Sequence, residues 1–371
     1  MIADDPVRPR TVHAVDHRRF DIGMPPGTAS LAVAYARRAA EAASVLTGTA
    51  WEVVEPAVLA HLLLPLFVGD APDIRPPREV PGGGWVHADL LPEDEDLFAT
   101  LAADEPEADA ERLAAIAQEC RLPVTPYRAA RATWASAPTA ALDPGRRIGA
   151  RDVSVIDMTA MWAGPLCTAL LADWGAEVVT VEPAVRPDGL RGAPAQFAAL
   201  DRGKRRVPWD LREREDREAF EAAVGRADVL VESFSPRVLP NLGYDGATLA
   251  RLNPRLTVVH IRAFPAGTAE ASWVAFGRGV HAASGLGMLG GQPVPALLAY
   301  PDPLAGLLAF ARILEALTGP RPGEIEVSLA EAIAPLLAVA GQPLGGRDDA
   351  AVAWLRDRAG GAAPGPVVVQ R

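Results

Sequence analysis

The amino-acid sequence predicts an α/β protein in which a Rossmann-like, mostly parallel sheet is joined to a second, smaller α+β domain. Three observations support this fold class. Strand-like and helix-like segments alternate from residue 151 to about residue 337, which is the pattern of βαβ units. The preceding residues lack this alternation, and a segment rich in Ala, Pro and Gly at 136–149 separates the two patterns. The 371 residues and 49% hydrophobic content suit a large core and favour two domains over one.

These patterns divide the chain into three expected parts. Residues 1–145 are expected to form the smaller N-terminal domain, and residues 146–340 the Rossmann-like domain. Residues 341–371 are rich in Gly, Pro and polar residues, so we expect a partly ordered C-terminal tail with one possible short helix at 351–358.

The first part begins with an amphipathic pattern at 29–46, where apolar residues recur at helical spacing. The apolar stretch 57–68 is interrupted by His61 and Pro65 and is too short to cross a bilayer, so it is interpreted as core. After a Pro/Gly-rich break at 72–84, the sequence predicts a small α+β unit whose segments are a strand at 84–90, a helix at 108–120 and an extended run at 122–127.

The second part predicts a parallel sheet whose ligands bind beyond the carboxyl ends of its strands. Its apolar runs are those expected of strands buried on both faces. The expected strands lie at 153–158, 176–182, 205–211, 228–233, 256–264 and within 324–337, and the longer expected helices at 164–175, 213–227 and 302–317.

The charge and cysteine content exclude several classes of partner. A formal net charge of −11 opposes binding to nucleic acid or to an anionic membrane surface, so an anionic ligand needs a local basic patch. Cys120 and Cys167 are the two cysteines, and their separation suggests neither a disulfide framework nor a zinc cluster. The acidic N-terminus lacks the pattern of a secretory signal. We expect a cytoplasmic protein.

Fingerprints of several cofactors are absent from the sequence. No P-loop occurs and no GxGxxG follows the first strand of the second part; the match at 285–290 follows no strand. We therefore expect neither a nicotinamide nor a flavin cofactor. His13 and His17 are spaced i, i+4 but have no further ligand nearby, so no metal is expected.

Four segments of the second part carry the chemical interpretation. Residues 159–165 form a strand-to-helix turn in which backbone amides become available to a ligand. Residues 201–206 contain four cations, among them Lys204, the single lysine of the chain, and Arg205, which are side chains suited to phosphate. Taken alone, the first segment is more typical of an ordinary βα turn, and the second is equally typical of a solvated charge run.

The other two segments are the strand and turn at 227–236 and the Pro-Asp-Pro sequence at 301–303. Asp302 precedes a long apolar helix at the expected N-cap position, with proline next to it. Taken alone, Asp302 is typical of a capping residue whose loss costs about 1 kcal/mol.

Taken together in this order, the segments resemble the family III CoA-transferases, the CaiB/BaiF family that includes formyl-CoA transferase, carnitine CoA-transferase and α-methylacyl-CoA racemase. The resemblance runs from residue 151 to about residue 337 through segments such as VSVIDMTAMWAGPLCTALLADWGAEVVTVEP, DRGKRRVPWDL, ADVLVESFSPRVLPNLGY, PDPLAG and GEIEVSLAEA.

The resemblance implies a site and a reaction. It implies that Asp302 is the nucleophile that forms an acyl anhydride and then a thioester with CoA, and we expect the helix dipole to keep this carboxylate ionised. It implies CoA, as substrate, facing Met161, Trp162, Ala163, Lys204, Arg205, Ser233 and Phe234.

The sequence also departs from the family. The racemase branch carries a histidine where this chain has Phe276, and His281 is interpreted as a structural histidine. The segment 82–127 resembles the end of the family's small domain but precedes the large domain instead of following it, and the glycine-rich loop of formyl-CoA transferase has no clear counterpart.

The predicted function is transfer of CoA between an acyl-CoA and a carboxylic acid by a homodimer. An acyl-CoA racemase or isomerase, and a catalytically reduced homologue that binds acyl-CoA or a partner chain, are the alternatives.

Overall fold

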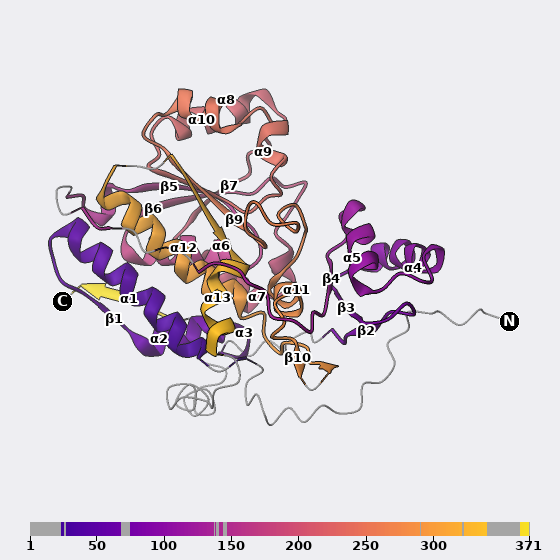
Figure 1. Ribbon diagram of the computed structural model, residues 1–371. Helices are drawn as coiled ribbons and strands as arrows, with labels where there is room; N and C mark the ends of the chain where they lie inside the picture. Colours follow the sequence, from indigo (N-terminus) through magenta and orange to yellow (C-terminus); the bar gives the residue numbers. More distant parts are fainter. Residues whose placement is uncertain are drawn as a thin grey trace.

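A six-stranded parallel sheet forms the centre of the molecule (Figure 1). The computed structural model describes residues 24–25, 27–67, 75–136, 138, 141–143, 147–289, 291–320, 323–339 and 364–370. Across the sheet the strands are β12 (Glu324–Ser328), β9 (Thr257–Arg262), β8 (Val229–Glu232), β5 (Ser154–Met158), β6 (Glu177–Val181) and β7 (Arg205–Val207). All five pairings are parallel, which confirms the predicted fold class.

The order of the strands determines where a ligand can bind. Counted along the chain, the strands lie in the order 6-5-4-1-2-3, so the winding direction reverses between β5 and β8. In sheets of this kind the crevice at the reversal, beyond the carboxyl ends of the strands, is the usual ligand site. The segments that follow β5 and β8 are therefore expected to line a ligand-binding site.

Helices cover both faces of the sheet (Figure 1). One face packs against α8 (Arg214–Val224), α9 (Val238–Asn241) and α10 (Gly246–Leu252). The other carries α6 (Ala163–Trp174), α7 (Pro194–Asp201), α12 (Pro301–Thr318) and α13 (Leu329–Val339). Their apolar side chains share a core with the strands because parallel strands are buried on both faces.

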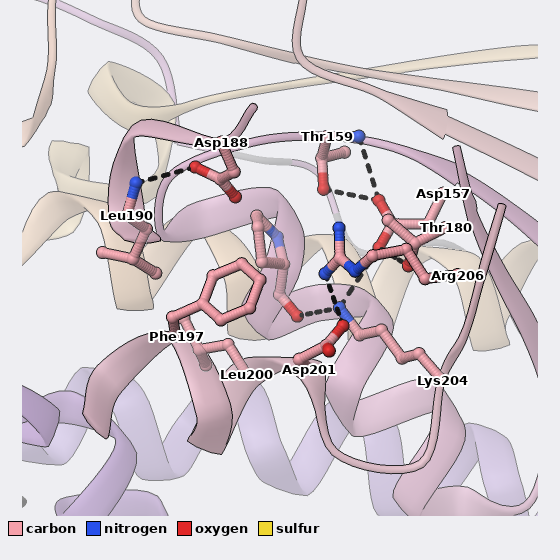
Figure 2. Close-up of a pocket in the computed structure, with 11 residues that line it drawn as sticks. Asp157, Thr159, Thr180, Asp188, Leu190, Phe197, Leu200, Asp201, Lys204 and Arg206 are labelled. Atoms are coloured by element: carbon pink, nitrogen blue, oxygen red, sulfur yellow. Dashed lines mark hydrogen bonds and ion pairs between the residues drawn. The ribbon is translucent and has the colours of Figure 1, made fainter. Parts of the chain in front are cut away.

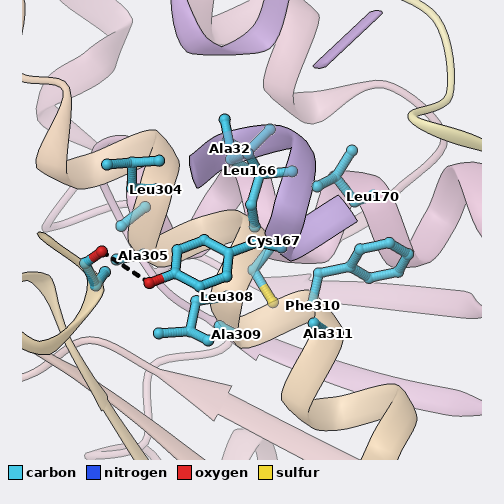
Figure 3. Close-up of a cluster of buried hydrophobic side chains, with 14 of the residues drawn as sticks. Ala32, Leu166, Cys167, Leu170, Leu304, Ala305, Leu308, Ala309, Phe310 and Ala311 are labelled. Carbon is cyan, nitrogen blue, oxygen red and sulfur yellow. Dashed lines mark hydrogen bonds between the residues drawn. The ribbon is translucent and has the colours of Figure 1, made fainter. Parts of the chain in front are cut away.

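Helix α12 lies at the centre of the helices on this second face of the sheet. It is apolar around its circumference, so other elements must cover it on several sides. Figure 3 shows α6 and α1 (Thr28–Thr47) flanking it, with Ala32, Leu166 and Leu308 in the shared core. A Cβ atom added at Gly306 would lie 2.7 Å from the carbonyl oxygen of Ala163. The absence of a side chain there allows α12 to approach the start of α6 closely.

A smaller layer is formed by the antiparallel strands β2 (Arg78–Glu79), β3 (Trp85–Ala88) and β4 (Val124–Pro126). Helices α4 (Glu95–Asp104) and α5 (Ala110–Glu119) share its apolar core. The sheet also contacts α11 (Gly277–Ala283), a helix of the large unit. The small unit and the large unit therefore meet at α11.

The packing differs from the division expected at residue 145. Helices α1, α2 (Glu55–Leu62) and α3 (Leu64–Phe67) precede that boundary, yet α1 and α2 share the core of the large sheet because α12 requires their cover. In the expected tail, β13 (Val368–Gln370) pairs antiparallel with β1 (Trp51–Val53). The short helix expected at 351–358 lies outside the described residues.

Within the described ranges, none of the helices combines the length and apolar character needed to span a membrane. In the same ranges, no group of His, Cys, Asp and Glu side chains is placed to hold a metal ion. The pair His13 and His17 lies outside the described residues.

Candidate active site

Two turns meet at the reversal point of the sheet. One follows β5 and contains Met161, and the other follows β8 and contains Ser233 and Phe234. The backbone amide of Ala160 donates a hydrogen bond to the hydroxyl of Ser233 over 3.2 Å, which joins the turns. Three residues that the resemblance assigns to CoA therefore lie at one edge of the sheet.

Met161 has an unusual backbone conformation. Its φ of 70° lies in the left-handed region, which a residue with a side chain enters at a cost. The Met161 amide donates to Asp188 Oδ1 over 3.0 Å, and this bond helps to hold the conformation. The side chain stays 36% exposed and available to a ligand. Sequence reasoning missed this role of Asp188, although the Asp-Gly pair at 188–189 signals a turn.

Trp162 and Ala163 begin α6 and are both buried at 6% exposure, so their side chains belong to the core. Their contribution to a ligand would come from the backbone at the helix start. A Cβ atom at Gly164 would lie 2.3 Å from Cβ of Thr159, so only glycine permits this tight strand-to-helix turn. Among the described residues, the indole Nε1 of Trp162 is buried without a hydrogen-bond partner.

Asp157, on β5, stabilises the turn that follows this strand. Its carboxylate accepts five hydrogen bonds, from the amide and hydroxyl of Thr159, from Thr168 and Thr180, and from Lys204. Burial raises the pKa of Asp157, but Lys204 and these hydrogen bonds outweigh burial and lower it below its ordinary value. Figure 2 shows Asp157 with Thr159, Thr180 and Lys204 beside a cavity that Leu190, Phe197 and Leu200 also line. The network fixes the turn and was missed from sequence, because its members are far apart in the chain.

Lys204 is buried, whereas a lysine that binds a phosphate group of CoA is expected to be accessible. Its side chain is 2% exposed. Its ammonium donates to Asp157 Oδ2 over 3.1 Å, to the Pro165 carbonyl over 2.9 Å and to Thr168 Oγ1 over 2.7 Å. An ammonium has three hydrogens, so these acceptors use its full donor capacity. Lys204 therefore fixes the start of α6 and has no donor left for a phosphate in this conformation.

The other cations of the basic loop are largely neutralised by acidic neighbours. Arg202 pairs with Asp173 at 2.6 Å, and Arg206 pairs with Glu182 at 2.6 Å. Arg205 has a side chain that is 60% exposed and approaches Glu177 only to 3.9 Å. Arg205 is thus the cation of this loop that remains most available to an anionic ligand.

Asp302 lies in the first turn of α12. The helix begins at Pro301, with Tyr300 at the N-cap, so the predicted N-cap position of Asp302 is wrong: Asp302 is the second helical residue. The Asp302 amide donates to the Ala299 carbonyl over 3.0 Å, which extends the turn backwards. Gly306, four residues later on the same helix face, contacts Ala163, so Asp302 lies about 6 Å along the axis from that contact.

The Asp302 carboxylate is 7% exposed, and its Oδ2 is buried without a hydrogen-bond partner in the described part of the chain. Burial raises the pKa of Asp302 to about 7, because the backbone of Gly277 and the charge of Arg278 only partly offset the loss of water. The sequence predicts that the helix dipole keeps this carboxylate ionised, whereas a pKa of about 7 leaves it only partly ionised at neutral pH. Desolvation outweighs the dipole at this position.

The histidine near this site is structural. Both ring nitrogens of His281 have partners, at 3.0 Å to the Tyr300 hydroxyl and at 2.9 Å to the Val294 carbonyl. Burial lowers the pKa of His281 to about 4, so it is neutral at pH 7. Phe276, at the position of the racemase histidine, is the N-cap of α11. Neither residue is placed to act as a second base.

Comparison with known protein families matches residues 151–350, more than half of the chain, to CoA-transferase family III. The chain belongs to CoA-transferase family III. The matched region contains Asp302, the two turns at the reversal point and the strands that position them. It also includes every site residue that the sequence predicts, although the match does not assign their roles.

Named relatives of this family member are CoA-transferases. Succinyl-CoA:mesaconate CoA-transferase of Haloarcula hispanica is 42% identical over 127 residues, which cover 30% of this chain and 31% of the relative. Acetyl-CoA:oxalate CoA-transferase of Acetobacter aceti is 34% identical over 146 residues, 38% of each protein. The chain thus spans about a third of the length of these relatives.

Among solved structures, a CAIB/BAIF family protein from Brucella suis is 27% identical, with a TM-score of 0.46 and coverage of 54% of this chain and 56% of that chain.

Proposed function

We propose that this protein transfers CoA from an acyl-CoA to a carboxylic acid, with Asp302 as the nucleophile. One observation carries the proposal: a buried carboxylate oxygen without a hydrogen-bond partner among the described residues, on the helix that packs against the turn at the reversal point. A carboxylate with unused lone pairs in a dry site is suited to attack a thioester carbonyl. A purely structural aspartate would be expected to have its acceptors filled.

The proposed reaction passes through three covalent intermediates on Asp302: an anhydride, a thioester and a second anhydride. The ionised Asp302 carboxylate attacks the thioester carbonyl, and CoA leaves as a thiolate while an acyl-aspartyl anhydride forms. The thiolate then attacks the Asp302 carbonyl carbon, which releases the first acid and leaves an aspartyl-CoA thioester. The carboxylate of the second acid displaces CoA in the same way, and attack of CoA on the new acyl carbonyl yields the second acyl-CoA and free Asp302.

The pKa of Asp302 is consistent with this role. A pKa raised to about 7 by burial leaves a substantial ionised fraction at neutral pH, and it makes the carboxylate a stronger base than an ordinary aspartate. Only the ionised form can attack. We therefore expect the first step to gain rate as the pH rises through about 7.

The proposed CoA site lies along the reversal point. Met161, Ser233 and Phe234 would contact the ligand with their side chains, while Trp162 and Ala163 would contribute backbone groups at the start of α6. Lys204 would hold this turn in place through its buried hydrogen bonds, and Arg205 would bind a phosphate group of CoA. The exposure of Arg205 and the internal bonds of Lys204 support this division of roles.

The acids named for the relatives are short dicarboxylic acids, mesaconate and oxalate, and we propose acids of this class as substrates here. We also propose that the protein is a cytoplasmic homodimer, in keeping with its family and its acidic, cysteine-poor composition.

The test is an exchange assay. The protein is incubated with succinyl-CoA, acetyl-CoA or butyryl-CoA and an isotopically labelled acid, and label in the acyl-CoA pool is measured. Transfer of label that depends on Asp302 is the expected result. Deuterium uptake at the α-carbon without acid exchange would indicate an isomerase instead, and neither exchange nor uptake would indicate a binding protein.

A further inference from the structure

The first turn of α11 lies between Asp302 and the small sheet. A Cβ atom at Gly277 would lie 2.0 Å from Asp302 Oδ2. A Cβ atom at Gly279 would lie 3.0 Å from Oγ1 of Thr125 on β4. Two residues of one helical turn therefore touch the carboxylate on one side and the small sheet on the other.

The face of the small sheet that meets α11 carries polar side chains. Thr125 pairs with His87 across β3 and β4, so both side chains project from the same face. His87 Nε2 lies 2.9 Å from Asp89 Oδ2. The small unit thereby brings a carboxylate to the region of Asp302, and the charge of Asp89 contributes to the raised pKa of Asp302.

Arg278 follows Gly277 on this turn and is half-buried. Its guanidinium makes two long hydrogen bonds, at 3.3 Å to the Ala296 carbonyl and at 3.4 Å to the Leu297 carbonyl. In the residues that the structure describes, it forms no ion pair within 4.0 Å. Its charge nevertheless lowers the pKa of both Asp302 and Asp89. Arg278 adjoins Gly277 in the turn that contacts Asp302, and its guanidinium makes only these two long bonds in the described ranges, so it has donors available there for an anionic ligand.

We propose that Arg278 binds the second carboxylate of a dicarboxylic acid whose first carboxylate reacts at Asp302. This proposal rests on the proposed function. A guanidinium presents paired N–H donors that match the two oxygens of a carboxylate, so the charge and the geometry both favour this ligand. Because Arg278 does not neutralise Asp302 by direct contact, it can hold the substrate while leaving the nucleophile free to attack. Monocarboxylic acids lack the group that Arg278 would bind.

The test measures binding without turnover. Calorimetric titrations of the full chain compare oxalate, malonate and succinate with acetate, propionate and butyrate. We expect at least one dicarboxylate to bind more tightly than the monocarboxylate of equal length. Arg278→Gln should lose about 10- to 100-fold of that affinity, the range for a hydrogen bond to a charged group, and leave the monocarboxylates unchanged. Arg278→Lys should fall between the two.

Arg121→Gln is the matched control, because Arg121, in the small unit, also donates to a backbone carbonyl, that of Ser272 over 2.7 Å. It should keep the wild-type preference for dicarboxylates. Equal binding of both acid classes by the wild type, or an Arg278→Gln variant that keeps the preference, would overturn the proposal. Detection of an acyl adduct on Asp302 tests the proposed function separately, so failure of one can be told from failure of the other.

Discussion

Two buried aspartates of the large unit, Asp157 and Asp302, show how the environment separates a fully hydrogen-bonded carboxylate from one with an unpartnered oxygen among the described residues. Asp157 is 1% exposed and Asp302 is 7% exposed. Asp157 accepts five hydrogen bonds and has a lowered pKa, whereas Asp302 has an oxygen without a partner in the described ranges and a pKa raised to about 7. Burial is common to both, so the supply of hydrogen-bond donors and of an adjacent cation decides the direction of the pKa shift.

The largest effect on stability is expected from Asp157→Asn. The substitution removes the charge that pairs with the buried ammonium of Lys204, and an uncompensated buried charge costs about 3–5 kcal/mol. Urea unfolding followed by circular dichroism measures the loss. If the single variant does not fold, the double variant Asp157→Asn with Lys204→Met should recover soluble protein, since it removes both charges. An Asp157→Asn variant as stable as the wild type would contradict the structural role.

Asp302 should make the folded protein less stable as the pH rises, because its pKa is raised, whereas that of Asp157 is lowered. Its folded pKa exceeds the unfolded value, so the native state holds the proton more tightly, and the stability this contributes is complete below about pH 4 and lost as the pH rises through about 7. The wild type should therefore lose about 1.4 kcal/mol per pH unit relative to Asp302→Asn within that window. Parallel urea titrations at pH 5, 6, 7 and 8 test this. A constant difference between the two proteins across that range would refute the raised pKa.

Gly277→Ala should disturb Asp302, the proposed nucleophile, through steric contact. The added Cβ would lie 2.0 Å from Asp302 Oδ2 and 2.9 Å from the Ala299 carbonyl oxygen, so the carboxylate or α11 must move. We expect a loss of about 1–3 kcal/mol in stability and a larger proportional loss of activity. Gly192→Ala is the control, because a Cβ there meets nothing within 4 Å. Equal behaviour of the two variants in unfolding and exchange assays would argue against close packing at Gly277.

The smallest effect is expected at the surface of the basic loop. Arg205→Glu should weaken CoA binding by about 2- to 5-fold and reduce its dependence on salt, because an exposed charge contributes little in water. Arg214→Glu on α8 changes the net charge equally, on a side chain that is 89% exposed. Calorimetry at two ionic strengths distinguishes the variants. The same loss of affinity in both would show a general charge effect and no phosphate contact at Arg205.

The sequence was sufficient for the fold class and for the strands and long helices of the large unit, because buried apolar runs and helical periodicity are local signals. The burial and hydrogen bonding of Lys204 were not predictable from the sequence, since its partners Asp157, Pro165 and Thr168 come from other elements. The same holds for the pKa of Asp302, which depends on packing of α11 and α12 and on the small sheet. The core shared by α1 and α12 explains why the boundary expected at residue 145 differs from the packing.

The most direct test of the central claim is intact-protein mass spectrometry after incubation with succinyl-CoA, acetyl-CoA and butyryl-CoA. We predict a covalent adduct on the wild type, mapped by peptide digestion to Asp302, and its absence from Asp302→Asn. Asparagine keeps the size of the side chain, so the variant should remain folded, while its amide is too poor a nucleophile to form the anhydride. No adduct on the wild type with any of these substrates, or an adduct that survives in Asp302→Asn, would contradict the assignment of Asp302 as the reactive carboxylate.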